Sequence, residues 1–314
     1  MKALPGGVVK FELTGLDEID GVSVEVGGTE ANILAASTRF VTICVPEGDG
    51  DQVVLHSQAG DCSTTLQVGE TVASELHPVA NPVVDESGNV FVTYSGTRGE
   101  RVPFSVFKVT PTGDKEPFLG DIMNPTGLAI GPDYSLYISS RHSGTVYRSS
   151  FDKQVEKFVD GLGIASGIAF DAAGNLFVGD RSGIIYKVSP EREVSMFCEL
   201  EPSVSAYHLA VGPDDVLYVT GPTLATQDSI YQINGEGTVE VFFKGFGRPQ
   251  GLAFDPDGNL QVTGSYKGLK GVYTFLGGVP ELTITSPMLV GLAYWYPQRT
   301  LYLVDSSNLY RLVV

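Results

Sequence analysis

The feature that most constrains the fold is a phrase that occurs six times along the chain. Its clearest copy, residues 248–264 (RPQGLAFDPDGNLQVTG), predicts a short apolar strand, a tight turn and a second, alternating strand. A repeat of about 40–50 residues built of strands and turns is typical of propeller blades, because one such unit cannot bury both of its faces alone. The second strands of the six copies lie 46, 40, 41, 43 and 41 residues apart and centre on Phe91, Tyr137, Phe177, Tyr218, Gln261 and Tyr302.

Each copy continues into a third strand, and most continue into a fourth. The third strands centre on the aromatic residues Phe107, Tyr147, Tyr186, Tyr231, Tyr273 and Tyr310. The sixth copy reaches Val314 just after its third strand, so its outer strand has to come from elsewhere. Residues 71–76 alternate like a strand and precede the first copy. We therefore expect a six-bladed β-propeller closed by a strand from the linker, which removes an exposed sheet edge.

Residues 1–69 do not carry the repeat. They predict six or seven short alternating strands separated by turns rich in Gly and Asp. That pattern is typical of a small sandwich of the immunoglobulin type. The expected fold is therefore all-β, with an immunoglobulin-like domain over residues 1–69 and the propeller over residues 70–314.

Two resemblances to known families accompany these patterns. The segments 5–9 (PGGVV), 24–31 (VEVGGTEA) and 41–48 (VTICVPEG) resemble the IPT/TIG immunoglobulin-like family. This resemblance implies a domain that contacts a protein partner and brings no catalytic residues. The repeated phrase, Gly-Leu-Ala-Phe at 251–254 followed by Asp-Gly-Asn-Leu at 257–260, resembles NHL repeats and the gluconolactonase (senescence marker protein, regucalcin) family. Propellers of this kind serve as lactonases, lyases or binding platforms.

The gluconolactonase resemblance implies a divalent metal, Ca²⁺ or Zn²⁺, bound by acidic residues of the inner strands. A hard cation requires anionic oxygens. The positions just before the repeated phrase carry no carboxylate, so we predict no metal ligands and no cofactor; the neutral oxygens of Asn81, Asn124 and Gln250 could serve only a loosely bound ion. Those positions are Ala80, Thr126, Ser166, Tyr207, Gln250 and Val290.

Charge and hydropathy exclude two classes of partner. The net charge of −17 argues against nucleic acid, which requires a basic surface, and against anionic membranes. No apolar stretch of about 18 residues predicts a membrane span. The start of the chain lacks an apolar run of signal-peptide length, so we expect a cytoplasmic protein as the sequence stands, or an exported one if a signal segment was trimmed. Pairing of Cys44 with Cys62 is open, although reduced thiols are commoner in cytosolic chains.

The loops expected at one end of the propeller channel are rich in basic residues. They contain seven basic side chains against four acidic ones, in a chain of net charge −17. Guanidinium groups offer paired donors to a carboxylate or phosphate, and they also staple neighbouring blades by binding backbone carbonyls. The candidate ligand-binding residues of this face are Arg98, Arg141, Arg181, Arg248, Lys267, Gln250, Asn81, Asn124 and Ser166.

These residues favour a binding propeller that captures a small anionic or polyhydroxylated ligand. The first alternative is a gluconolactonase-like hydrolase or a lyase of sugar-derived lactones, with His208 as general base and Tyr207 or Asp180 as its companion. The second alternative is a protein-interaction scaffold. Whether the protein is an enzyme stays open at this point, because no nucleophile-elbow or phosphate-loop motif occurs.

Overall fold

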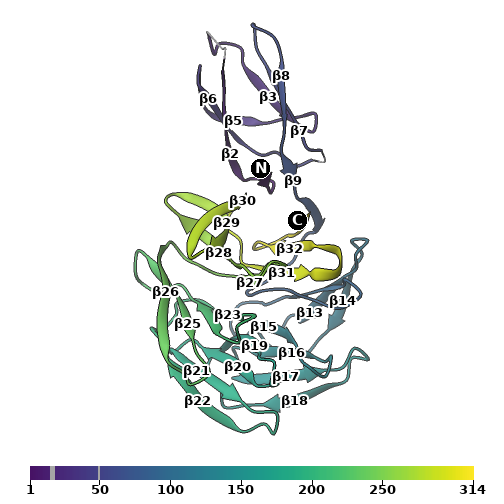
Figure 1. Ribbon diagram of the computed structural model, residues 1–314. Coiled ribbons are helices and arrows are strands. Elements are labelled where there is room, and N and C mark those ends of the chain that lie inside the picture. The colour runs from purple at the N-terminus through teal and green to yellow at the C-terminus, as the bar shows by residue number, and fades with distance from the viewer. Residues whose placement is uncertain (15–17, 49) are drawn as a thin grey trace.

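The chain is all-β, as predicted (Figure 1). The computed structural model describes residues 1–14, 18–48 and 50–314. Within these ranges the helical structure consists of one short 3₁₀ helix, η1 (Tyr296–Gln298). No helix among the described residues has the length and hydropathy needed to cross a membrane.

Two small sheets form the N-terminal part, which lies at the top of Figure 1. They enclose one apolar core, to which β6 contributes Val41 and Ile43 in the alternating pattern of a half-buried strand. Cys44, Cys62 and Cys198 are all free thiols. The immunoglobulin type of this sandwich stays a prediction. One sheet has the order β2 (Val8–Glu12), β6 (Phe40–Cys44), β5 (Asn32–Ser37), and the other the order β4 (Thr29–Glu30), β3 (Ser23–Val26), β7 (Gln52–His56), β8 (Cys62–Thr65).

Six sheets follow, one for each copy of the repeat, and the strands of each copy pair antiparallel. We call them blades 1 to 6. Their strands are β11 (Val83–Val84), β12 (Val90–Thr93), β13 (Val106–Val109) and β14 (Lys115–Leu119) in blade 1; β15 (Pro125–Ile130), β16 (Leu136–Ser140), β17 (Thr145–Ser149) and β18 (Val155–Val159) in blade 2; β19 (Ala165–Phe170), β20 (Leu176–Asp180), β21 (Ile184–Val188) and β22 (Val194–Glu199) in blade 3; β23 (His208–Val211), β24 (Leu217–Thr220), β25 (Asp228–Ile233) and β26 (Val239–Phe246) in blade 4; β27 (Leu252–Phe254), β28 (Leu260–Tyr266), β29 (Leu269–Leu276) and β30 (Val279–Thr285) in blade 5; and β31 (Gly291–Trp295), β32 (Thr300–Val304) and β33 (Leu309–Val313) in blade 6.

The first strands of the blades contact one another in sequence order. β11 contacts β15, the contacts continue through β19, β23 and β27 to β31, and β31 contacts β11 again. The inner strands therefore form a ring, which gives the lower part of Figure 1 its propeller-like appearance. Neighbouring blades share apolar clusters, which include Phe91, Tyr137 and Tyr218 from the second strands.

The turn inside the repeated phrase has one geometry in three of the blades. The backbone N–H groups of Asn89, Asn175 and Asn259 each donate to the Asp four residues earlier, at 2.8 Å in every case. Gly88, Gly174 and Gly258 precede these asparagines with φ of +81°, +84° and +82°, a conformation that favours glycine. The shared pattern, an Asp followed three and four residues later by Gly and Asn, is thus a turn requirement and not a ligand motif.

The linker provides the outer strand of blade 6. β10 (Glu70–Ala73) pairs antiparallel with β33, giving the sheet order β10-β33-β32-β31. The strand is shorter than the predicted 71–76 and begins one residue earlier. The Arg311 guanidinium clamps the pairing, because its Nη2 lies 2.6 Å from the Glu70 carboxylate.

A feature that the sequence did not predict joins the N-terminal part to blade 5. β1 (Lys2–Ala3) pairs in parallel with both β30 and β9 (Gln67–Val68), so it extends the sheet of blade 5. The next residue, Leu4, is fully buried and packs in an apolar cluster that blades 5 and 6 share. The division at residue 69 stays a prediction, since this sheet contains strands from both sides of it.

Candidate functional site

A cavity of about 230 Å³ lies where the inner strands begin. Four of the six positions just before the repeated phrase line it: Thr126, Ser166, Gln250 and Val290. Because the inner strands form a ring, these equivalent positions converge on one space, as the repeat predicts. The other lining residues are Pro78, Val79, Arg141, Arg181, Val204, Ser205 and Ala206.

Two arginines directly follow the second strands of blades 2 and 3 and reach this cavity. The Arg141 Nη2 donates to the backbone oxygen of Gly96 in blade 1, at 3.0 Å. The Arg181 Nη2 donates to the backbone oxygen of Val204, at 2.6 Å. Each guanidinium therefore binds a backbone carbonyl of a neighbouring loop while it also lines the cavity.

No carboxylate balances the charge of these side chains. Among the described residues, no Asp or Glu oxygen lies within 4 Å of a guanidinium nitrogen of Arg98, Arg141 or Arg181. The Nε of Arg141 is buried and has no hydrogen-bond partner. Burial, followed by the charges of Arg181 and Arg98, lowers the pKa of the Arg141 guanidinium. An anion in the cavity would relieve the repulsion between these guanidinium groups.

The three residues of the lactonase alternative lie outside the cavity lining. His208 is fully buried, neither ring nitrogen has a partner, and desolvation lowers its pKa to about 3. Tyr207 is buried in the apolar cluster between blades 3 and 4, and its hydroxyl donates to the Glu201 backbone oxygen. The Asp180 carboxylate accepts from Ser182 and from the Ile164 backbone, at 2.8 Å for the latter. The structure does not bring these three groups to a common substrate.

Several candidate ligand residues instead bind the protein itself. The Asn81 amide donates to the Leu252 backbone oxygen, and Asn124 binds the backbone of the loop at 96–99. The Arg248 backbone N–H donates to Asp228, while the Lys267 ammonium lies over the Tyr266 ring at 5.1 Å. None of these residues, nor Arg98, lines the cavity. Of the nine candidates, Arg141, Arg181, Ser166 and Gln250 meet there.

The lining also includes residues that were absent from the candidate set. Thr126 occupies the same repeat position as Ser166 and Gln250, so the alignment of the copies was the signal that could have found it. Val204, Ser205 and Ala206 belong to the loop between blades 3 and 4, whose path no local motif indicates. Pro78 and Val79 enter from the segment before blade 1.

The residues at the cavity do not fit the divalent metal that the gluconolactonase resemblance implies. The equivalent positions carry a hydroxyl at Thr126 and Ser166, an amide at Gln250 and an alkyl group at Val290. Within the described part of the chain, no three His, Cys, Asp or Glu side chains are grouped as metal ligands. We therefore derive no chemical step through a metal.

The fold is similar to that of several solved structures. These include a putative gluconolactonase (TM-score 0.63, 18% identity, covering 77% of this chain and 90% of that chain). An auxiliary nutrient binding protein from Bacteroides ovatus ATCC 8483 has a TM-score of 0.58 at 11% identity and covers 99% of this chain and 95% of its own. Virginiamycin B lyase from Staphylococcus aureus has a TM-score of 0.54 at 14% identity, covering 98% and 99%.

These likenesses establish a gluconolactonase-like propeller fold. No protein-family model matches the sequence, and no curated protein matches it. Because proteins of this fold include hydrolases, lyases and binding proteins, function has to be argued from the site.

Proposed function

We propose that this protein captures a small hydroxylated carboxylic acid in the cavity lined by Arg141 and Arg181. In the same proposal, blades 1 to 6 form a six-bladed propeller closed by β10, and residues 1–69 are an immunoglobulin-like domain that contacts a protein partner. The observation that carries the binding site is the pair of guanidinium groups that line one cavity without a carboxylate partner among the described residues.

The chemistry of the lining supports an acid that also carries hydroxyl groups. A carboxylate accepts paired hydrogen bonds from guanidinium groups, and such charge-assisted bonds are among the strongest in proteins. The Gln250 side-chain amide lines the cavity and makes no hydrogen bond to described residues, so it can donate to a ligand hydroxyl and accept from one. Thr126 and Ser166 also line the cavity, but their hydroxyls already donate to the backbone oxygens of Asn124 and Gly179, so Gln250 carries the hydroxyl contact of this proposal.

The size of the cavity favours a small ligand. Its volume of about 230 Å³ equals that of about seven or eight water molecules at roughly 30 Å³ each. A monocarboxylic sugar acid is of this size, whereas an oligosaccharide would extend into solvent.

Hydrolysis of a sugar-derived lactone is the alternative that the fold keeps open. A general base should lie within hydrogen-bond reach of the water it activates. His208 is buried outside the lining, and the two arginines are the titratable groups among the described residues that line the cavity. Capture without turnover is therefore the better supported function. In a scaffold without a small ligand, the two guanidinium groups would serve only to bind the backbone carbonyls of neighbouring loops.

Titration calorimetry separates these functions. We expect gluconate to bind, its neutral lactone and glucose to bind more weakly, and no lactone to be consumed. Loss of a charge-assisted hydrogen bond costs about 1.5–3 kcal/mol, so Arg181→Ala should weaken gluconate binding by about tenfold to 150-fold.

The matched control is Lys267→Ala, which removes a positive charge from the same group of loops but outside the cavity. We expect this variant to bind gluconate within about twofold of the unmodified protein, because exposed charges are screened by salt. Turnover of the lactone would establish the hydrolase instead. Absence of binding to every acid tested would favour the scaffold.

A further inference from the structure

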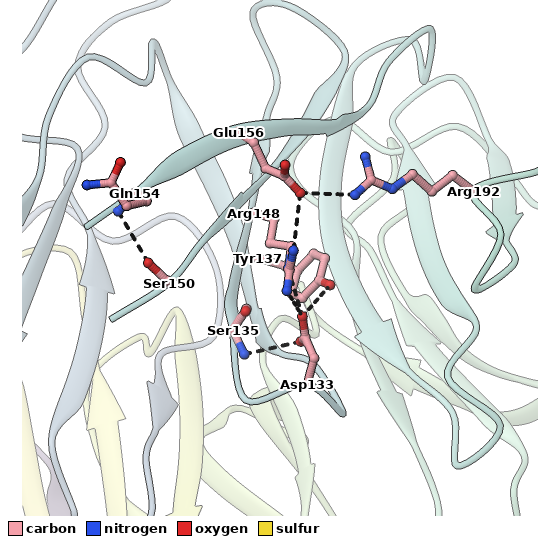
Figure 2. Close-up of polar contacts among 8 residues, drawn as sticks. All are labelled: Asp133, Ser135, Tyr137, Arg148, Ser150, Gln154, Glu156 and Arg192. Atoms are coloured by element: carbon pink, nitrogen blue, oxygen red, sulfur yellow. Dashed lines mark hydrogen bonds and ion pairs between the residues drawn. The ribbon is translucent and has the colours of Figure 1, made fainter. Parts of the chain in front are cut away.

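A polar network in blade 2, which Figure 2 shows, is the starting point for an inference about a second site. The Asp133 carboxylate accepts from the Tyr137 hydroxyl at 3.3 Å and from the Arg148 Nε at 2.7 Å. The Glu156 carboxylate accepts from Arg148 at 3.3 Å and from Arg192 of blade 3 at 3.0 Å. Two arginines of the chain thus neutralise two carboxylates at the junction of blades 2 and 3.

Aromatic rings pack against these charged side chains at the same junction. The Arg192 guanidinium lies over the Phe158 ring at 4.7 Å from its centroid. Tyr137 packs edge-on against Phe158 at 5.0 Å and against Phe170 at 4.8 Å. A guanidinium above an aromatic face, next to a carboxylate, is a favourable cation–π arrangement.

The repeat places the same set of residues in blade 4. Tyr218 corresponds to Tyr137, and its hydroxyl lies 3.3 Å from Asp214, as that of Tyr137 does from Asp133. Tyr218 packs edge-on against Phe242 at 5.4 Å and Phe254 at 5.3 Å, the counterparts of Phe158 and Phe170. The aromatic and acidic parts of the arrangement are therefore present twice.

Both cations are missing from the second copy. Gln232 occupies the position in blade 4 that Arg148 occupies in blade 2, because Gln232 lies opposite Glu240 as Arg148 lies opposite Glu156. The Gln232 side-chain amide donates to the Glu240 carboxylate at 2.8 Å. The turn that carries Arg192 in blade 3 is replaced in blade 5 by Gly277–Gly278, which brings no side chain.

A cavity of about 470 Å³ lies at the place of the missing cations. Its lining includes Asp214, Tyr218, Phe242, Phe254 and Phe275. Among the described residues, no Lys or Arg forms an ion pair with Asp214 or Glu240, and none lies over these rings. The groove between blades 4 and 5 is thus an aromatic and acidic site without a cation of its own.

We propose that this groove binds an arginine side chain of a partner polypeptide. The incoming guanidinium would stack on Phe242, as Arg192 stacks on Phe158, and pair with Asp214, as Arg148 pairs with Asp133. A planar guanidinium suits an aromatic face and a carboxylate together better than a compact ammonium does. The site shares no lining residue with the cavity of Arg141 and Arg181, so it is independent of the function proposed above.

The test is titration of the intact protein with a short capped peptide, Gly-Arg-Gly, and with its citrulline counterpart, which keeps the shape and removes the charge. We expect the arginine peptide to bind saturably and the citrulline peptide to bind at least about tenfold more weakly. Asp214→Asn should weaken binding of the arginine peptide by about tenfold, the effect of one charge-assisted hydrogen bond.

A second variant keeps the proposal testable if the acidic substitution perturbs the fold. Gln232→Arg restores the counterpart of Arg148, so it should occupy the groove, abolish binding of the arginine peptide and leave the melting temperature equal or higher. Two results would overturn the proposal: no saturable binding of the arginine peptide by the unmodified protein, or equal binding by the unmodified and Gln232→Arg proteins.

Discussion

Truncation of Leu4 to alanine tests how the N-terminal segment is integrated into the propeller. The Leu4 side chain is fully buried among residues of blade 6, including Leu303 and Leu312. The Leu4 backbone N–H donates to the Thr285 backbone oxygen at 2.9 Å. The Leu4 side chain also packs closely on Gly69: a methyl group added to Gly69 would lie 2.4 Å from the Leu4 Cδ2. The leucine is thus enclosed by chain segments from both ends of the sequence.

The magnitude follows from the carbon atoms removed. Three buried carbons contribute about 2.4 kcal/mol at about 0.8 kcal/mol each, and the residual cavity brings the loss to about 3–4 kcal/mol. For a unit of this size that loss lowers the melting temperature by about 6–16 °C.

Thermal unfolding followed by circular dichroism measures the shift. Leu34→Ala is the matched control, because Leu34 on β5 is 51% exposed and its truncation should cost less than about 0.5 kcal/mol. If Leu4→Ala lowers the melting temperature no more than the control does, the N-terminal segment is not a structural part of blade 6 and our reasoning is wrong.

Two further predictions concern blade 6 and the buried histidine. The Glu70 and Arg311 side chains are 52% and 29% exposed, so a double-mutant cycle on urea unfolding should give a coupling free energy of about 1 kcal/mol. Strictly additive effects of the two single substitutions would contradict the ion pair between β10 and β33. Burial lowers the pKa of His208 to about 3, whereas in the unfolded chain it is about 6.5, so the unfolded state binds the proton first. Stability should fall as the pH drops from about 6.5 toward 3, and His208→Leu should lose this part of the pH dependence; parallel pH profiles of the two proteins would refute the assignment.

The repeat made most of the propeller-like fold predictable. All six aromatic positions aligned on third strands lie on third strands of the blades, because strand period and turn chemistry are local properties of the sequence. β1 was not predictable, since a two-residue strand has no period and its partners, Ile284 and Gln67, are far away in the chain.

The site was predictable in part. The basic loops indicated Arg141 and Arg181 because loop positions follow from the repeat. The sequence could not reveal which basic side chains line the cavity. Lys267 follows a second strand, as Arg141 and Arg181 do, but its ammonium lies over the Tyr266 ring, outside the lining. The role of His208 as a general base stays a prediction: its repeat position suggested the channel, whereas its side chain is buried and lies outside the cavity lining.

A crystal structure of the protein with gluconate tests the central claim most directly. We predict electron density in the cavity, with the carboxylate about 2.7–2.9 Å from nitrogens of Arg141 and Arg181 and a hydroxyl group on Gln250. Density for the acid at another place, or a cavity that contains only water at a saturating gluconate concentration, would contradict the account.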